Sequence, residues 1–186
     1  MEFIGDPAIL DQLYGTGPTA VDRVDNPVLR ELDQAHLAFL DHATFVVVST
    51  ADHAGLTCSP RGGAAGTLAS VRDGRTLWLP DVAGRIHQTV HNLMIDPRIG
   101  LLFMVAGQDE VLRIAGTARV SASAEPLAEV SRPGLSATTV IVVDVQRVRT
   151  SGTGPLKRAG LHGDRAGLPT DTDPGATPPP SLVIAE

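Results

Sequence analysis

Apolar and polar positions change their period along the chain, and this change separates a helical segment from a long region of strands. Apolar side chains recur every three to four positions from Asn26 to Asp41, which predicts a helix with one apolar face. Asn26 suits the N-cap of this helix, and Pro27 suits its first position. From Thr44 onward, short runs rich in Val, Ile, Leu and Thr predict strands. The predicted strands cover residues 44–50, 56–62, 67–73, 76–80, 98–105, 110–121 and 138–149.

Turn residues between these runs indicate how the strands are joined. Asp73-Gly74 marks a tight hairpin, Gly107 marks another turn, and Gly116 indicates a bulge or bend inside strand 110–121. Two further helices are expected, at about 84–95 and 125–130. The regular strand–helix alternation of parallel sheets is missing. We therefore predict a mainly β fold, a closed or nearly closed antiparallel β-barrel with peripheral helices.

The length and composition of the chain fit one globular domain with extensions at both ends. The 186 residues are 42% hydrophobic but only 3% aromatic, so a core of Val, Leu, Ile and Ala is expected. The last part of the chain is rich in Gly, Pro, Thr and Asp, a composition typical of disorder. We expect an N-terminal extension over residues 1–25, the barrel domain over 26–160 and a disordered tail over 161–186.

Charge and cysteine content argue against several classes of protein. The net charge of −6 is unfavourable for a nucleic-acid binder or a polybasic membrane protein. Cys58 is the only cysteine, which excludes an intramolecular disulfide and a cysteine-rich zinc site. Lys157 is the only lysine, which argues against Schiff-base chemistry. The N-terminus lacks a signal-peptide pattern and no apolar run approaches about 18 residues, so a cytoplasmic location is expected.

Two arginines stand where a bound anion would explain them. Arg61 follows a predicted strand and precedes two glycines, which let a ligand approach the backbone. Arg85 falls in the first turn of the helix expected at 84–95, where a cation opposes the helix dipole. A phosphate held between the helix N-terminus and these guanidinium groups would remove that penalty. The alternative is that both arginines are solvated or paired with Asp81 and Asp96.

Several linked motifs, in order along the chain, resemble one known family. They are the segments SPRG (59–62), TLWLPD (76–81) and GLLFMVAGQDEVLRIAGTARV (100–120). Together they resemble the FMN-binding split-barrel proteins of the pyridoxamine 5'-phosphate oxidase-like superfamily, over roughly residues 32–149, and most closely its bacterial branch of FMN-dependent enzymes. The resemblance implies a split barrel of six to seven antiparallel strands of Greek-key type. It also implies a homodimer with two FMN molecules across the subunit interface.

The resemblance also implies which residues bind the cofactor. Carried over position by position, the FMN-binding residues would be Ser59, Arg61, Pro80, Asp81, Arg85, Gln88, Asn92, Arg113 and Lys157. In this assignment Arg61 and Arg85 hold the phosphate, and Ser59 borders the ring or the ribityl chain. Gln88 and Asn92, one helical turn apart, hydrogen-bond the flavin or orient Arg85.

The chain departs from the family pattern at several positions. Gly63 stands where the family usually has an acidic residue after Arg-Gly, and Ile86 and His87 follow Arg85 where an Asn and two arginines are usual. The C-terminal segment that grips pyridoxamine phosphate is not recognisable. These departures argue against oxidation of vitamin B6. His87 and His91 have a spacing that can hold a metal, but no third ligand stands nearby and phosphate is favoured.

No Ser-His-Asp set or close carboxylate pair emerges, as expected where a cofactor supplies the chemistry. The function implied by the resemblance is that of an FMN-dependent oxidoreductase, transferring hydride between flavin N5 and a small organic substrate. One alternative is a flavin-binding carrier or sensor without turnover. Another keeps the fold but exchanges FMN for F420 or haem.

Overall fold

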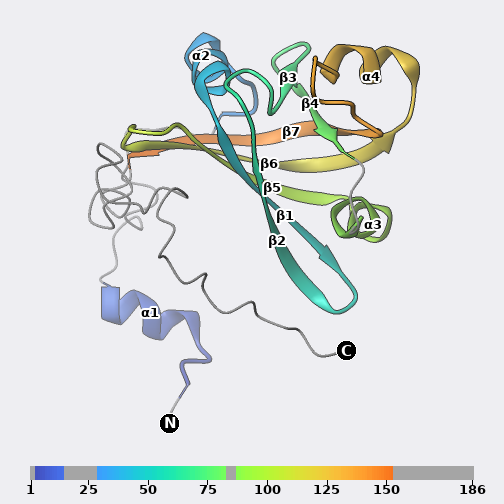
Figure 1. Cartoon of the computed structure of the whole chain (residues 1–186). Helices are drawn as coiled ribbons and strands as arrows, with labels where there is room; N and C mark the ends of the chain where they lie inside the picture. Colours follow the sequence, from blue (N-terminus) through green and yellow to red (C-terminus); the bar gives the residue numbers. More distant parts are fainter. Residues whose placement is uncertain (1–2, 15–28, 83–86, 153–186) are drawn as a thin grey trace, which may run out of the picture.

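The structure of the protein is a computed structural model that describes residues 3–14, 29–82 and 87–152 (Figure 1). The described residues form the strands β1 (Phe45–Asp52), β2 (Gly55–Gly62), β3 (Ser70–Val71), β4 (Thr76–Asp81), β5 (Arg98–Met104), β6 (Glu110–Ser121) and β7 (Thr139–Gly152). They also form the helices α1 (Pro7–Tyr14), α2 (Gln34–His42), α3 (Gln88–Ile95) and α4 (Ala124–Val130). None of these helices has the length and apolar character needed to cross a membrane.

All of these strands belong to one sheet, in the order β2-β1-β5-β6-β7-β4-β3. Every neighbouring pair in this order is antiparallel. The predicted mainly antiparallel fold with peripheral helices is therefore confirmed. The sheet is not closed, because β2 forms one edge and β3 the other. It curls strongly, so that β1 and β2 run across β5, β6 and β7 in Figure 1 and the edge strand β2 comes close to β4.

Alternating burial along the strands defines the inside of the curled sheet. In β1, Val46, Val48 and Thr50 are buried while the residues between them are half-buried. The inward side chains of β4, β5, β6 and β7 continue this core, with Leu77 and Phe103 fully buried. The core consists mainly of Val, Leu and Ile, as the low aromatic content predicted. Aliphatic residues that branch at Cβ pack well on a pleated surface, which explains how few aromatic residues suffice.

The helix predicted from Asn26 begins later than expected. Asn26 and Pro27 lie outside the described residues, Leu29 forms a bridge with Val148, and α2 starts only at residue 34. Asp33 is the N-cap, since its carboxylate accepts the backbone N–H of His36 at 3.0 Å. The His36 ring accepts the Asp33 backbone N–H in return, at 3.2 Å. This reciprocal capping fixes the start of the helix and corrects the earlier boundary.

The helix predicted at 84–95 is also shorter than expected. α3 begins at Gln88 with His87 as its N-cap, so Arg85 does not fall in its first turn. Glycine at position 84 and an arginine that opposes the helix dipole are both poor residues for a first turn, which gives a physical reason for the late start. Arg85 itself lies outside the described residues.

The glycine turns and the bulge agree with the sequence. Gly74 has φ of +74° in the predicted Asp73-Gly74 hairpin between β3 and β4. The pairing of β6 with β7 shifts register between Ala115 and Gly116. A Cβ at Gly116 would stand 2.0 Å from the backbone oxygen of Asp144, so only glycine permits this close approach. The strand predicted at 67–73 shortens to β3, because Thr67 is held in a turn by Ala64.

Candidate functional site

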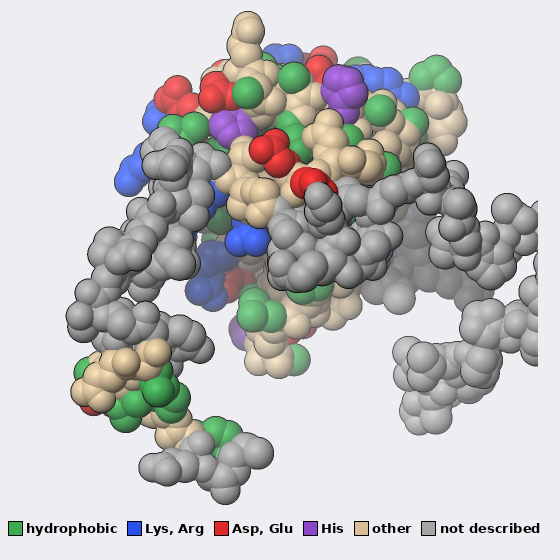
Figure 2. Space-filling model, turned by 90° about the vertical axis from the view of Figure 1, so that its left-hand side faces the viewer, with side chains coloured by type: hydrophobic (Ala, Val, Ile, Leu, Met, Phe, Trp, Pro, Cys, Tyr) green, Lys and Arg blue, Asp and Glu red, His purple; other side chains and the backbone are tan. Residues whose placement is uncertain are grey.

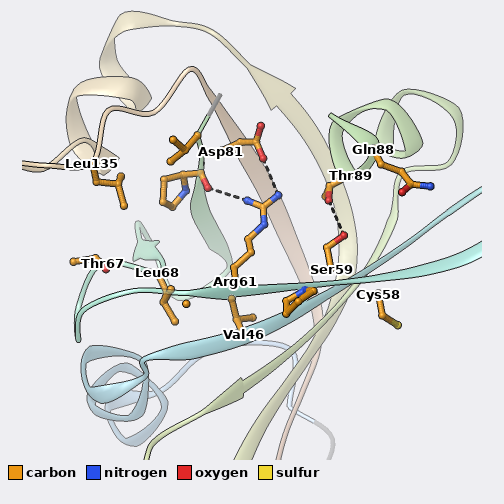
Figure 3. Close-up of a pocket in the computed structure, with 14 residues that line it drawn as sticks. Val46, Cys58, Ser59, Arg61, Thr67, Leu68, Asp81, Gln88, Thr89 and Leu135 are labelled. Atoms are coloured by element: carbon orange, nitrogen blue, oxygen red, sulfur yellow. Dashed lines mark hydrogen bonds and ion pairs between the residues drawn. The ribbon is translucent and has the colours of Figure 1, made fainter. Parts of the chain in front are cut away.

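A cavity of about 530 Å³ opens in the gap between the edge strand β2 and β4 (Figure 3). Its walls come from β1, β2, β4, the start of α3 and the loops after β2 and α4. The lining residues are Val46, Cys58, Ser59, Pro60, Arg61, Gly62, Thr67, Leu68, Pro80, Asp81, Val82, Gln88, Thr89 and Leu135. Five of the residues predicted from the sequence are therefore brought together here: Ser59, Arg61, Pro80, Asp81 and Gln88.

Arg61 extends from β2 across the gap to the end of β4, as Figure 3 shows. Its Nη1 donates a hydrogen bond to the backbone oxygen of Pro80 at 2.9 Å. Its Nη2 donates to Oδ1 of Asp81 at 2.7 Å, in an ion pair whose side chains are 22% and 14% exposed. The Thr139 hydroxyl donates to Oδ2 of Asp81 at 3.4 Å. The pairing of Arg61 with Asp81 that the alternative interpretation expected is therefore present in this structure, whereas Asp96 is paired with Arg98.

The opposite wall of the cavity carries hydroxyl groups. Thr89, buried in the first turn of α3, donates a hydrogen bond from Oγ1 to Oγ of Ser59 at 3.3 Å. Gln88 is the first residue of α3 and is exposed, and its amide is directed away from Arg61 in Figure 3. The cavity therefore combines one guanidinium group, one carboxylate, several hydroxyls and an apolar remainder.

Asn92 lies outside this lining, although the sequence placed it with Gln88. Its side chain is buried, at 1% exposure, and its Nδ2 donates to the hydroxyls of Thr50 at 3.0 Å and Thr57 at 2.9 Å. The two threonines face each other across β1 and β2, with 3.2 Å between their hydroxyl oxygens. Asn92 therefore fixes α3 to the β1–β2 hairpin.

Arg113 also lies away from the cavity, on an exposed position of β6 directly opposite Arg149 of β7. Arg147 follows on the same face of β7, paired with Ala115. Figure 2 looks onto the end of the molecule where the β5–β6 turn and the end of β7 lie, and basic and acidic side chains are mixed on this face. Nε of Arg149 is buried without a hydrogen-bond partner among the described residues. Arg85 and Lys157 lie outside the described residues, so their assignment stays a prediction.

The sequence reasoning missed several residues of the cavity. Thr89 is adjacent to Gln88, and the hydroxyl at this position of a helix start was a usable signal. Thr67 and Leu68 follow the glycine-rich segment after Arg61, where a close turn was predictable. Leu135 comes from the loop after α4, and no local pattern connects that loop with β2. Cys58 is exposed at the rim, with its sulfur 3.4 Å from the Ser49 hydroxyl.

Metal binding gains no support from the described part of the chain. No group of three or more His, Cys, Asp or Glu side chains comes together there in a way that could hold a metal ion. His87 is the N-cap of α3 and His91 lies one turn further along the same helix, and both are exposed.

A comparison with models of protein families shows which family the chain belongs to. The model described as Pyridoxamine 5'-phosphate oxidase matches residues 32–152, which include all of the sheet and the cavity. This chain therefore belongs to the pyridoxamine 5'-phosphate oxidase family, and the resemblance seen in the motifs is confirmed. No curated protein matches the chain at a significant level.

Solved structures share the fold at low sequence identity. HupZ from Group A Streptococcus matches with a TM-score of 0.54 and 17% identity, over 66% of this chain and 97% of that protein. A Lactobacillus delbrueckii protein provisionally named a pyridoxamine 5'-phosphate oxidase has a TM-score of 0.52 and 15% identity, over 66% of this chain and 97% of that protein. A Clostridium acetobutylicum protein related to general stress protein 26 has a TM-score of 0.50 and 14% identity, over 63% of this chain and 86% of that protein. At such identities these likenesses show the common split-barrel fold.

Proposed function

We propose that this protein is an FMN-dependent oxidoreductase that transfers hydride between flavin N5 and a small organic substrate. The observation that carries the proposal is the cavity, which holds the Arg61 guanidinium among hydroxyl and apolar side chains in a member of this family. Its volume of about 530 Å³ lies within the rough range of 300–1,000 Å³ for small-molecule sites. The best supported part of the proposal is a phosphate-bearing cofactor, because a guanidinium group is suited to phosphate.

The chemistry of the donors present fits FMN. A guanidinium group offers five N–H donors, of which Arg61 gives two to Pro80 and Asp81 in the structure. The hydroxyls of Ser59 and Thr89 are available to polar atoms of a ribityl chain or ring edge, and Leu68 and Leu135 supply apolar walls. When bound, FMN supplies the acceptance and donation of hydride at N5. The chain's own residues bind the cofactor, orient it and exclude water.

A carrier or sensor without turnover is the second candidate, and one observation favours it. Arg61 and Asp81 are the only charged side chains that line the cavity among the described residues, and they are paired with each other. Among the described residues, the lining offers no carboxylate, histidine or lysine outside this pair that could act as a general acid or base. A haem would need an axial ligand, and among the described residues of the lining Cys58 is the only side chain of a usual type.

The outer face of the sheet supports a homodimer as part of this proposal. Phe45 pairs with Met104, and Val47 pairs with Leu102, on the face of β1 and β5 that points away from the core. All four of these apolar side chains are only half-buried in the single chain. A second copy packed on this face would remove them from water, as the family resemblance implies for a dimer that shares its flavin sites.

The first test is binding of FMN to the purified protein and to Arg61→Ala, followed by the absorption spectrum and by titration. We expect Arg61→Ala to weaken FMN binding by roughly 10- to 100-fold, because a charge-assisted bond to phosphate is lost. Arg85→Ala should also weaken FMN binding. Arg119→Ala, on an exposed position of β6, is the matched control and should bind FMN like the wild type.

Equal FMN affinity in both site variants and the wild type, with folded protein in each case, would contradict the assignment of the phosphate site. F420 and haem are titrated in parallel, so that a different cofactor is detected directly. Reduction of bound flavin by NADH or NADPH, followed by reoxidation with a substrate, separates an enzyme from a carrier. Bound flavin that never cycles supports the second candidate.

A further inference from the structure

The Arg61–Asp81 pair spans the open side of the barrel. In the sheet order, β2 and β4 are separated by β1, β5, β6 and β7, so no backbone ladder connects them. The gap is crossed instead by side-chain bonds from Arg61 to the Pro80 oxygen and the Asp81 carboxylate, drawn as dashed lines in Figure 3. The contact therefore lies inside the candidate ligand cavity and not beside it.

The ion pair with Asp81 also neutralises the positive charge of Arg61 in the cavity. Both partners are shielded, with side-chain exposures of 22% and 14%, and 2.7 Å separates Nη2 from Oδ1. A charge-assisted bond at this distance is stronger than one between neutral groups, and reduced contact with water strengthens it further. Asp81 is itself held by Thr139 through Oδ2, although the 3.4 Å distance makes this the weaker bond. An incoming phosphate would thus meet a guanidinium that already has an anionic partner.

We propose that Asp81 is an internal competitor for the anion that Arg61 binds, and that it sets the affinity of the cavity for phosphate-bearing ligands. This inference rests on the proposed function, because it concerns the same arginine. A phosphate can take full advantage of Arg61 only when the Asp81 carboxylate leaves Nη2. Asp81 is thereby a specificity-determining residue that acts against anions in general, so the rest of the ligand has to supply enough binding to displace it.

The test uses FMN, riboflavin and inorganic phosphate with the full chain. Asp81→Asn keeps the shape and the hydrogen-bonding oxygen but removes the negative charge. We expect it to bind FMN at least about tenfold more tightly than the wild type, while riboflavin, which lacks the phosphate, changes little. Inorganic phosphate alone should raise the melting temperature of the variant more than that of the wild type. Asp144→Asn, an exposed change of the same charge on β7, is the control and should affect none of these ligands.

Thr139→Val keeps the Asp81 charge and removes only the hydroxyl that holds it, so it should shift FMN affinity in the same direction by a smaller factor. It also serves as the test if Asp81→Asn does not fold. Tight FMN binding that is unchanged or weaker in both variants would overturn the competitor role and leave the proposed function standing. Phosphate stabilisation that increases in Asp81→Asn, without FMN binding to any variant, would support the competitor role and overturn the proposed cofactor. Absence of any response to phosphate and FMN would overturn both.

Discussion

At the scale of single residues, the main result is that neighbouring polar side chains of one helix have different tasks. Thr89 faces the cavity and bonds to Ser59, whereas Asn92, one turn later, is buried against Thr50 and Thr57. The sequence pattern placed Asn92 with Gln88 at the cofactor site, because apolar periodicity does not separate the roles of polar residues on one helix. A buried amide that makes two hydrogen bonds is expected to be important for stability whatever its part in binding.

Asn92→Ala should therefore destabilise the protein in the absence of any flavin. We expect a loss of about 1–3 kcal/mol in the free energy of unfolding, because two hydrogen bonds and the packing of a buried side chain are removed. His91→Ala, an exposed change on the same helix, should stay within about 0.5 kcal/mol of the wild type. Denaturant unfolding of the flavin-free proteins measures both. Wild-type stability of Asn92→Ala would contradict this structural role of Asn92.

At the scale of elements, most strands and the helix α4 were predictable, and the starts of α2 and α3 were not. β6 was predicted with its observed bounds, and β1, β2, β4, β5 and β7 to within a few residues, because runs of Val, Ile and Leu between glycine turns define strands locally. α2 and α3 begin later than their patterns suggested. Their starts depend on the Asp33–His36 capping and on the position of His87, which apolar periodicity does not report. Among the lining residues from loops, Leu135 could be found only in three dimensions, because no local pattern connects the loop after α4 with β2.

The turn between α3 and β5 makes a pH-dependent contribution to stability. The Asp96 carboxylate accepts hydrogen bonds from the side chain and the backbone N–H of Arg98, and these lower the pKa of Asp96 from 3.8 to about 2. Because the pKa in the folded state lies below that of the unfolded chain, the stabilisation is complete above pH 4 and is lost as the pH falls toward 2.

Asp96→Asn should accordingly be less stable than the wild type at pH 7, and the two proteins should converge between about pH 4 and pH 2. The effect should be modest, since this ion pair is near the surface, where water and salt screen it. Asp144→Asn serves as the control for loss of one exposed carboxylate. Thermal unfolding across this pH range is the measurement, and a stability difference as large at pH 2 as at pH 7 would contradict the assignment.

At the scale of the whole molecule, the family match and the last described strand end at the same residue. The family match stops at residue 152 and β7 ends at Gly152, which agrees with a barrel domain that the sequence predicts to end near residue 160. The sheet order itself could not be read from the sequence. It depends on pairings between distant segments, such as β1 with β5 and β4 with β7, for which only the family resemblance was informative.

Deletion of residues 166–186 should leave the domain intact. We expect the melting temperature to change by less than about 2 °C, and the affinity for FMN to be unchanged, because the described residues up to 152 already form a core and a cavity. Thermal unfolding and FMN titration of the truncated protein check both expectations. A fall of many degrees would show that the tail packs on the domain, and weaker FMN binding would assign it a part in the site.

The open edge at β2 also has a consequence for how the protein behaves in a crowded solution. An unpaired strand edge presents backbone groups that another chain can extend into a larger sheet, which is a common route to aggregation. β2 carries Pro60, which has no backbone N–H to donate, directly before Arg61, whose charge is costly to bury between strands. The residues that shape the cavity thus also protect the free edge. A variant in which both Pro60 and Arg61 are replaced to raise the ligand affinity of the cavity would therefore risk aggregation.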